Sequence, residues 1–338
     1  MLRRTVRART PATSMKVLVV GGAGYIGAHM CKLLAESGFE LVVCDDLSTG
    51  HRAALRWGKF VQASIGDVAA VDSLLARERP DVVMHFAACS LVGESVANPL
   101  KYWHNNVGNT LVLLEAMRRH GIARFVFSST AAIFGEPRSE LIDEDHPMRP
   151  LNPYGHTKLA VEQALRDACA AHELRAVALR YFNAAGADPS GWIGESHQPE
   201  THLIPRLLRR AAGEDLEVCI FGDDYPTPDG TCVRDYVHVN DLADAHLRAL
   251  QQLECEAGFQ CYNLGNGTGH TVREVVSAVE EVTGRSLNIP VGPRRSGDPA
   301  ALVASSSRAR ERLGWEPRYR AIRSIIESAW HWHRRPAY

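Results

Sequence analysis

Residues 16–27 read Lys-Val-Leu-Val-Val-Gly-Gly-Ala-Gly-Tyr-Ile-Gly, and this stretch decides the fold class of the chain. The apolar run that ends at Val20 predicts a buried strand, and Gly21, Gly24 and Gly27 predict a tight turn from that strand into a helix. Backbone amides at the N-terminus of a helix attract anions. The stretch therefore indicates a site for the pyrophosphate of a dinucleotide.

Short β-branched runs alternate with longer helical stretches over residues 16–180. The expected strands are residues 17–20, 40–44, 60–63, 82–86, 125–128 and 176–181, and the segments between them are expected to be helices. Strands separated by helices form a parallel sheet that is covered on both faces. We therefore expect an α/β fold with a doubly wound parallel Rossmann sheet, whose ligand crevice lies at the carboxyl ends of the strands.

Changes in composition and hydrophobic pattern divide the chain into three parts. Residues 1–14 carry four arginines and no acid, which resembles a transit peptide in composition but fits better a disordered or extra tail, or an upstream start codon. Residues 15–182 are expected to form the dinucleotide-binding domain. Residues 183–338, with loops rich in Gly, Pro and Asp, are expected to form a smaller C-terminal lobe. Because residues 259–264 are strand-like, parts of 234–264 are expected to rejoin the first domain.

Composition argues against several classes of partner. The 338 residues contain 38 Lys and Arg against 39 Asp and Glu, so no overall field favours nucleic acid or an anionic membrane. No apolar stretch approaches the roughly 18 residues of a membrane span. The eight cysteines never occur as Cys-x-x-Cys, which predicts reduced thiols and a cytoplasmic location. The 15 histidines show neither His-x-x-x-His nor zinc spacing with cysteine, so we expect no metal site.

The residue after the second strand predicts the identity of the dinucleotide. Asp45 lies about 20 residues beyond the glycine loop, where a carboxylate accepts hydrogen bonds from the ribose hydroxyls of adenosine. A 2′-phosphate at this point would face a like charge, so NAD is favoured over NADP. The alternative is that Asp45 and Asp46 only begin a turn. Asp67, after the third strand, is expected to meet the adenine.

The expected chemistry depends on Tyr154 and Lys158. Asn152 and Pro153 predict the N-cap and first residue of a helix, so the tyrosine and the lysine four residues later share one face. We expect the ammonium and a positive nicotinamide ring to lower the pKa of Tyr154, which makes the phenol a competent base. Thr130, at the end of a strand, is expected to hold the reacting hydroxyl. The alternatives are a solvent-facing Tyr/Lys pair and a plain strand-end hydroxyl.

Taken together, these motifs resemble the extended short-chain dehydrogenases/reductases and, within them, the UDP-glucose 4-epimerases. The resemblance covers residues 15–332, and its specific stretches are residues 21–27, 85–88 with 92–95, 105–107, 128–135, 152–158, 180–183, 221–235 and 293–298. It implies tightly bound NAD, a UDP-sugar substrate, a homodimer and epimerisation through a transient 4-keto sugar.

The resemblance also assigns residues. For the cofactor it implies Gly21, Gly24, Tyr25, Ile26, Gly27, Asp45, Asp46, Leu47, Ser48, Thr49, Gly50, Asp67, Val68, Phe86, Ala87, Ala88, Ser90, Asn106, Lys158 and Phe182. For the nucleotide sugar it implies Thr130, Tyr154, Asn183, His202, Leu203, Arg234, Arg295, Asp298 and Leu302, with the two arginines on the diphosphate.

Two positions depart from the family pattern. Ser90 stands where many relatives carry lysine, so a cofactor contact is lost or replaced there. Leu302 stands where some members have a tyrosine that narrows the sugar pocket, which leaves more room here.

Other functions remain open from the sequence. A nucleotide-sugar dehydratase would need an acidic pair after Thr130, and Ala131 and Ala132 follow instead. A nonenzymatic NAD sensor on this fold would be expected to lack the pair of Tyr154 and Lys158. A UDP-N-acetylhexosamine or UDP-pentose 4-epimerase stays possible.

A homodimer would need an apolar surface. The segment at 99–120, with Leu100, Trp103, Leu111 and Leu114, offers either an interhelical face for this purpose or an ordinary core stripe.

Overall fold

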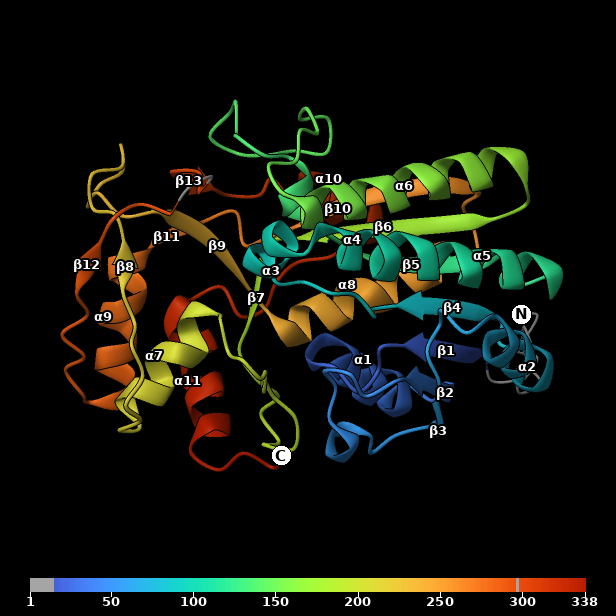
Figure 1. Cartoon of the computed structure of the whole chain (residues 1–338), viewed down its shortest axis with the longest axis horizontal. Coiled ribbons are helices and arrows are strands. Elements are labelled where there is room, and N and C mark those ends of the chain that lie inside the picture. The colour runs from blue at the N-terminus through green and yellow to red at the C-terminus, as the bar shows by residue number, and fades with distance from the viewer. Residues whose placement is uncertain (1–14, 296–297) are drawn as a thin grey trace, which may run out of the picture.

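The computed structural model describes residues 15–295 and 298–338, so the expected N-terminal tail lies outside the described residues. Within them, seven parallel strands form a large sheet in the order β10-β6-β5-β4-β1-β2-β3, on the right of Figure 1. The strands are β1 (Lys16–Val20), β2 (Glu40–Asp45), β3 (Lys59–Gln62), β4 (Val82–His85), β5 (Arg124–Thr130), β6 (Arg175–Tyr181) and β10 (Gly258–Leu264). The expected strands and the doubly wound Rossmann sheet are confirmed.

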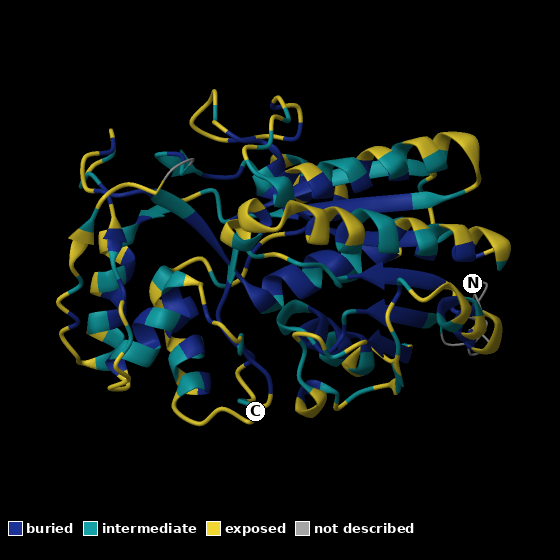
Figure 2. Cartoon of the chain, in the orientation of Figure 1, coloured by how far each residue is buried: buried dark blue, intermediate teal, exposed yellow. Residues whose placement is uncertain are grey.

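Helices cover both faces of this sheet because successive strand residues point to opposite sides. Val17 and Val19 of β1 pack in a cluster with α1 (Tyr25–Glu36), α8 (Val239–Gln252) and α10 (Ser307–Leu313). Leu18 and Val20 pack on the other side in a cluster with the helices α2 (Val68–Glu78), α5 (Asn109–Arg119) and α6 (Pro153–Ala171). Figure 2 shows the strands buried between these layers, while the outer helix faces are exposed.

The expected helix between β2 and β3 is wrong, because this segment contains only the 3₁₀ turn η1 (Arg52–Ala54). The chain instead runs tightly over the glycine loop, where a Cβ on Gly50 would come within 2.7 Å of the Cβ of Ala23. Leu47 has a φ of 62°, which a right-handed helix does not allow.

The connection between β4 and β5 contains several short helices. These are α3 (Val92–Ala97), α4 (Pro99–Tyr102) and the π-helix η2 (Trp103–Gly108), which leads into α5.

A smaller lobe lies on the left of Figure 1 and has its own core. Its sheet is built around β9 (Val233–His238), which pairs with β7 (Asn183–Ala185), β11 (Gly269–Thr271) and β13 (Ala301–Leu302). A separate ladder joins β8 (Ile220–Phe221) to β12 (Val291–Gly292). The helices α7 (Leu203–Ala211), α9 (Val272–Thr283) and α11 (Ile322–His333) bury Leu207, Val279 and Ile325 in one cluster.

The chain passes repeatedly between the two lobes. After β9 it returns to the large sheet as α8, and β10 then pairs in parallel with β6 along its whole length. We propose on this basis that residues 15–182 and parts of 234–264 form one domain, and that the rest of 183–338 forms the second. In the described residues, none of the helices combines the length and apolar character that a membrane span requires.

Candidate active site

The glycine loop between β1 and α1 forms a close-fitting cradle. Gly21 has a φ of 79°, and a Cβ on it would lie 2.4 Å from the backbone nitrogen of Ala87. A Cβ on Gly27 would lie 2.2 Å from the carbonyl oxygen of Gly21. Gly24 differs, since its nearest neighbour would be that same oxygen at 3.5 Å. No side chain caps α1 at Gly24, so its first-turn amides suit an anion, and the cradle fits a dinucleotide pyrophosphate.

Asp45 lies at the end of β2 beside this cradle. Its Oδ2 accepts a hydrogen bond from the Ala23 amide at 2.9 Å, and its Oδ1 accepts one from the Leu47 amide at 2.8 Å. Burial raises the pKa of Asp45, while these amide hydrogen bonds act to lower it. A carboxylate offers about four acceptor positions, so two remain for ribose hydroxyls. Asp46 accepts from the Ser48 amide at 2.9 Å and does begin a turn.

The remaining predicted cofactor positions follow β3 and β4. Asp67 caps α2 by accepting from the Ala70 amide at 3.0 Å, so its carboxylate has a structural role, and the next residue, Val68, is exposed. Asn106 is buried, and its side chain exchanges hydrogen bonds with the backbone of Cys89 at 2.9 and 3.0 Å and donates to Thr157 at 3.1 Å. Asn106 therefore fixes the loop of residues 86–90 against α6.

Tyr154 lies in the first turn of α6, where the predicted cap is confirmed. The Asn152 side chain accepts from the Gly155 amide at 2.9 Å, and Pro153 is the first helical residue. The Thr130 side chain, at the end of β5, lies close enough to the Tyr154 hydroxyl to act to lower its pKa. Thr130 also accepts from the Ala132 amide at 3.1 Å, which caps the short turn η3 (Ala131–Ile133). Tyr154 and Thr130 thus lie together at the carboxyl edge of the sheet.

Lys158 follows one turn later on α6 and is almost fully buried. Its Nζ donates to the carbonyl oxygen of Ser128 at 2.8 Å and lies 6.0 Å from the centre of the Tyr154 ring. Burial lowers the pKa of Lys158 to about 7, and the nearby Cys89 and Glu162 oppose this shift. Burial raises the pKa of Tyr154, and only the Thr130 hydrogen bond opposes it. Among the groups of the chain, desolvation therefore dominates, and the expected lowering of the tyrosine pKa by the lysine together with a positive nicotinamide ring stays a prediction.

Two features of this site were not predicted from the sequence. The hydroxyl of Tyr181, at the end of β6, hydrogen bonds to the Ser128 side chain. Glu162, on the same face of α6 as Lys158, forms a buried ion pair with Arg180 of β6 and accepts from the Ser129 hydroxyl at 2.6 Å. The pattern Tyr-x-x-x-Lys-x-x-x-Glu was the available signal, since each position is one helical turn after the previous one.

The smaller lobe supplies a polar wall from β9 and β13. Arg234 forms an ion pair with Asp298 and donates to the Val233 carbonyl oxygen at 2.7 Å. Leu302 pairs with Arg234 across the ladder and packs against the cluster around Ala131 and Ile133, directly after Thr130. The structure thus brings these three predicted sugar-site residues together near the end of β5.

The other predicted substrate residues have separate environments. Arg295 lies over the ring of Phe221 at 4.5 Å, and Asn183 donates to the Asp235 carbonyl oxygen at 3.0 Å. Phe182 packs against the same cluster as Leu302. His202 precedes Leu203, the first residue of α7. Its Nδ1 lies within 2.8 Å of the carboxylate of Glu195.

His202 belongs to a compact group that the sequence analysis missed. Its four members are Glu195, His197, Glu200 and His202, and one potential ligand atom of each lies within 4.8 Å of the others. The spacing Glu-x-His-x-x-Glu-x-His was the available signal, but it is neither His-x-x-x-His nor a cysteine motif.

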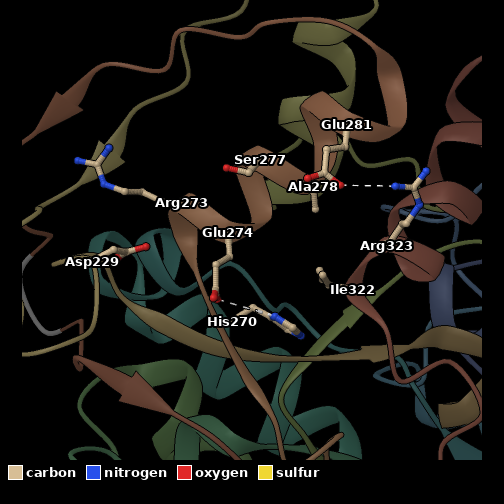
Figure 3. Close-up of a pocket in the computed structure, with 9 residues that line it drawn as sticks. All are labelled: Asp229, His270, Arg273, Glu274, Ser277, Ala278, Glu281, Ile322 and Arg323. Carbon is tan, nitrogen blue, oxygen red and sulfur yellow. Dashed lines mark hydrogen bonds and ion pairs between the residues drawn. The ribbon is translucent and has the colours of Figure 1, made fainter.

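A hollow of about 460 Å³ lies elsewhere in the smaller lobe, between α9 and the start of α11 (Figure 3). Its wall includes the pair of His270 and Glu274 and the pair of Glu281 and Arg323. None of the predicted site residues lines it, so we do not assign it to the active site.

Residues 17–265 match the family model described as NAD dependent epimerase/dehydratase family. The chain belongs to this family.

Its relatives narrow the class further. The chain is 52% identical over 317 residues to a UDP-glucose 4-epimerase of Rhizobium leguminosarum bv. trifolii, covering 94% of this chain and 97% of the relative. Among solved structures, it is 49% identical, with a TM-score of 0.90, to UDP-glucose 4-epimerase from Brucella ovis in complex with NAD, covering 94% and 98% of the two chains. It is 41% identical, with a TM-score of 0.84, to the UDP-Glc/GlcNAc 4-epimerase from Campylobacter jejuni, covering 95% and 99%.

Proposed function

We propose that this chain catalyses the reversible 4-epimerisation of UDP-galactose and UDP-glucose with tightly bound NAD. The observation that carries the proposal is the position of Tyr154, in the first turn of α6 beside Thr130 at the end of β5, with Lys158 one turn further along α6 and its Nζ on the Ser128 carbonyl oxygen at 2.8 Å. Tyr154 lies at the carboxyl edge of a Rossmann sheet whose glycine loop forms a pyrophosphate cradle. Bound NAD supplies a hydride acceptor and donor for C4 of the sugar.

Residues of the chain bind the sugar hydroxyl, transfer its proton and hold the cofactor. Thr130 holds the sugar 4-hydroxyl, and the Tyr154 oxygen accepts its proton and later returns a proton to the 4-keto sugar. Lys158, whose ammonium is held by the Ser128 carbonyl, favours the phenolate electrostatically. Asp45 accepts hydrogen bonds from the adenosine ribose, and the residues of loops 46–50 and 86–90, with Phe182, line the cofactor site.

Epimerisation also requires that the nucleotide is held while the sugar turns over. A sugar bound as firmly as the nucleotide could not present its opposite face. Arg234 and Arg295 are the proposed diphosphate ligands, with Asn183, His202, Leu203 and Asp298 around the rest of the nucleotide sugar. Because the guanidinium of Arg234 is already oriented by Asp298, little side-chain freedom would be lost on binding.

The test uses purified protein without added cofactor. We expect conversion of UDP-galactose to UDP-glucose, and we expect denaturation of the protein to release NAD. A 2′-phosphate would be repelled by Asp45, so recovery of mostly NADP would contradict the cofactor assignment. Formation of a 4-keto-6-deoxy sugar in place of UDP-glucose would instead indicate a dehydratase.

We also propose that the chain forms a homodimer through α3 to α5. Leu100, Trp103 and Leu111 expose 78%, 41% and 42% of their surface, while Leu114 packs against the core. Exposed apolar side chains gathered on adjacent helices are typical of an interface. Leu100→Glu should convert a dimer to a monomer in light scattering. A wild-type monomer, or an unchanged dimer in the variant, would contradict this interface.

A further inference from the structure

The group formed by Glu195, His197, Glu200 and His202 has the chemistry of a metal site. The two carboxylate side chains are 5% and 2% exposed and face each other across the two imidazoles. Burying two negative charges is costly unless cations compensate them. In the described residues, the ion pairs of these two carboxylates are made with these two histidines.

The spacing between the potential ligand atoms is short enough for all four side chains to share one metal ion. His197 Nδ1 is closed off from solvent and has no hydrogen-bond partner. It lies 3.3 Å from Glu195 Oε1 and 3.5 Å from Glu200 Oε2. His202 Nδ1 lies 2.8 Å from the same Glu195 oxygen and 3.2 Å from Glu200 Oε1. Bonds of about 2.0–2.1 Å in a tetrahedron place ligand atoms about 3.4 Å apart. The distances from His197 Nδ1 to Glu195 Oε1 and Glu200 Oε2, 3.3 and 3.5 Å, are close to this edge length, while the contact of His202 Nδ1 with Glu195 Oε1, at 2.8 Å, is shorter.

We propose that these four side chains bind one divalent transition-metal ion, and that Zn²⁺ fits the site best. Two imidazole nitrogens and two carboxylate oxygens form a donor set that Zn²⁺ accepts, and four protein ligands leave no position for catalysis. With neutral imidazoles, the charges of the ion and the two carboxylates sum to zero. The ion is therefore structural, and because His202 faces the group through Nδ1, its Nε2 stays available for the proposed contact with the nucleotide sugar.

The position of the group indicates what the ion stabilises. The His197 ring lies edge-on to Tyr25, which begins α1 beside the glycine loop, with ring centres 6.2 Å apart. His51 hydrogen bonds to the Ser196 carbonyl oxygen at 2.8 Å, and Tyr25 donates to the Gly186 carbonyl oxygen at 2.6 Å. The loop of residues 195–202 therefore contacts the large domain at one end and begins α7 at the other. Metal binding holds this loop against the cofactor cradle.

Direct measurement of metal binding tests the proposal. The purified protein is treated with a chelator and titrated with Zn²⁺ by calorimetry, and metal content is measured by mass spectrometry. We expect one ion per chain and a higher melting temperature with Zn²⁺, because a ligand that binds only the folded state stabilises it. Co²⁺ should give the visible absorption of a tetrahedral site with nitrogen and oxygen ligands.

Matched variants identify the ligands. His197→Gln and Glu200→Gln should each weaken Zn²⁺ binding by at least about 10-fold and abolish the zinc-dependent rise in melting temperature. His270→Gln is the control, because His270 lies outside the group and its ion-pair partner in the described residues is Glu274, at 3.9 Å; this variant should bind Zn²⁺ like the wild type.

Failure of the stripped wild-type protein to bind Zn²⁺ in a one-to-one ratio would overturn the proposal. Equal binding by the wild type and both ligand variants would also overturn it. If a ligand variant fails to fold, the Co²⁺ spectrum of the wild type tests the proposal, because a spectrum without tetrahedral nitrogen and oxygen coordination would contradict it. All these measurements are independent of epimerase activity.

Discussion

Replacing Glu162 by Gln should weaken the helix that carries Tyr154 and Lys158. The Glu162 carboxylate is fully buried and accepts from four donor groups. Oε1 accepts from Ser129 at 2.6 Å and from Arg180 Nε at 2.9 Å, and Oε2 accepts from terminal nitrogens of Arg180 at 2.6 Å and Arg166 at 3.0 Å. A glutamine would place an NH₂ group against two of these donors, whichever oxygen it replaces, and would remove the charge.

The expected loss in the free energy of unfolding follows from the charge that would remain in the core. Arg180 has an exposed fraction of 0%, so loss of its carboxylate partner leaves an uncompensated buried charge. Removing one partner of such a pair costs about 3–5 kcal/mol in the free energy of unfolding. At about 2–4 °C per kcal/mol for chains of somewhat smaller size, the melting temperature should fall on the order of 10 °C. We expect kcat to fall more than KM rises, because Tyr154 and Lys158 are displaced.

Calorimetry and steady-state kinetics on UDP-galactose measure these effects. Arg166→Gln is the matched control, because Arg166 is partly exposed and gives Glu162 a single hydrogen bond, worth about 1 kcal/mol or less. The double variant Glu162→Gln with Arg180→Met removes the unpaired charge and should recover part of the melting temperature. If Glu162→Gln melts like Arg166→Gln, the buried pair does not hold the helix and the reasoning is refuted.

Three further variants probe the site. Tyr154→Phe should lose about 10²- to 10⁴-fold in turnover while retaining NAD, because the ring still packs but no oxygen accepts the proton; near-normal turnover would exclude Tyr154 as the base. Gly24→Ala should fold normally yet release less NAD on denaturation, since its Cβ has room within the chain but belongs to the loop that is proposed to hold the pyrophosphate, whereas Gly21→Ala should be destabilised by the contact with Ala87. Equal NAD content in Gly24→Ala and wild type would contradict that placement. Leu302→Tyr should depress turnover of UDP-N-acetylgalactosamine about 10- to 200-fold more than that of UDP-galactose, because the acetamido group needs the volume that leucine leaves; equal losses on both sugars, or no wild-type turnover of the acetylated sugar, would refute the role of Leu302.

Local patterns were sufficient to predict most of the fold. The strand runs, the glycine turn and the cap at Asn152 all depend on neighbouring residues, so they could be predicted from short stretches. The helix expected before β3 was wrong because packing of Gly50 on Ala23 is a tertiary effect. Asp67 was interpreted only as an adenine contact, although the same position also caps a helix.

The candidate site was less predictable because several of its groups come from distant segments. The pairing of Glu162 with Arg180 joins a helix to a strand, and the Tyr181 hydroxyl meets Ser128 only through the register of β5 and β6. The pKa of Tyr154 depends on how deeply the finished fold buries the ring, which no spacing reveals. The loop of Glu195 to His202 is local in sequence, but its spacing is not among the familiar metal motifs.

The repeated passage of the chain between its lobes limits how the molecule can move. β6 runs almost directly into β7, β9 continues without a break into α8, and β10 precedes β11 by a few residues. A hinge that swings one lobe away from the other would have to bend all of these connections together. Wide opening is therefore disfavoured, and we expect nucleotide exchange to proceed through rearrangement of surface loops around a stiff frame. The sugar would then rotate within a chamber whose walls stay in place.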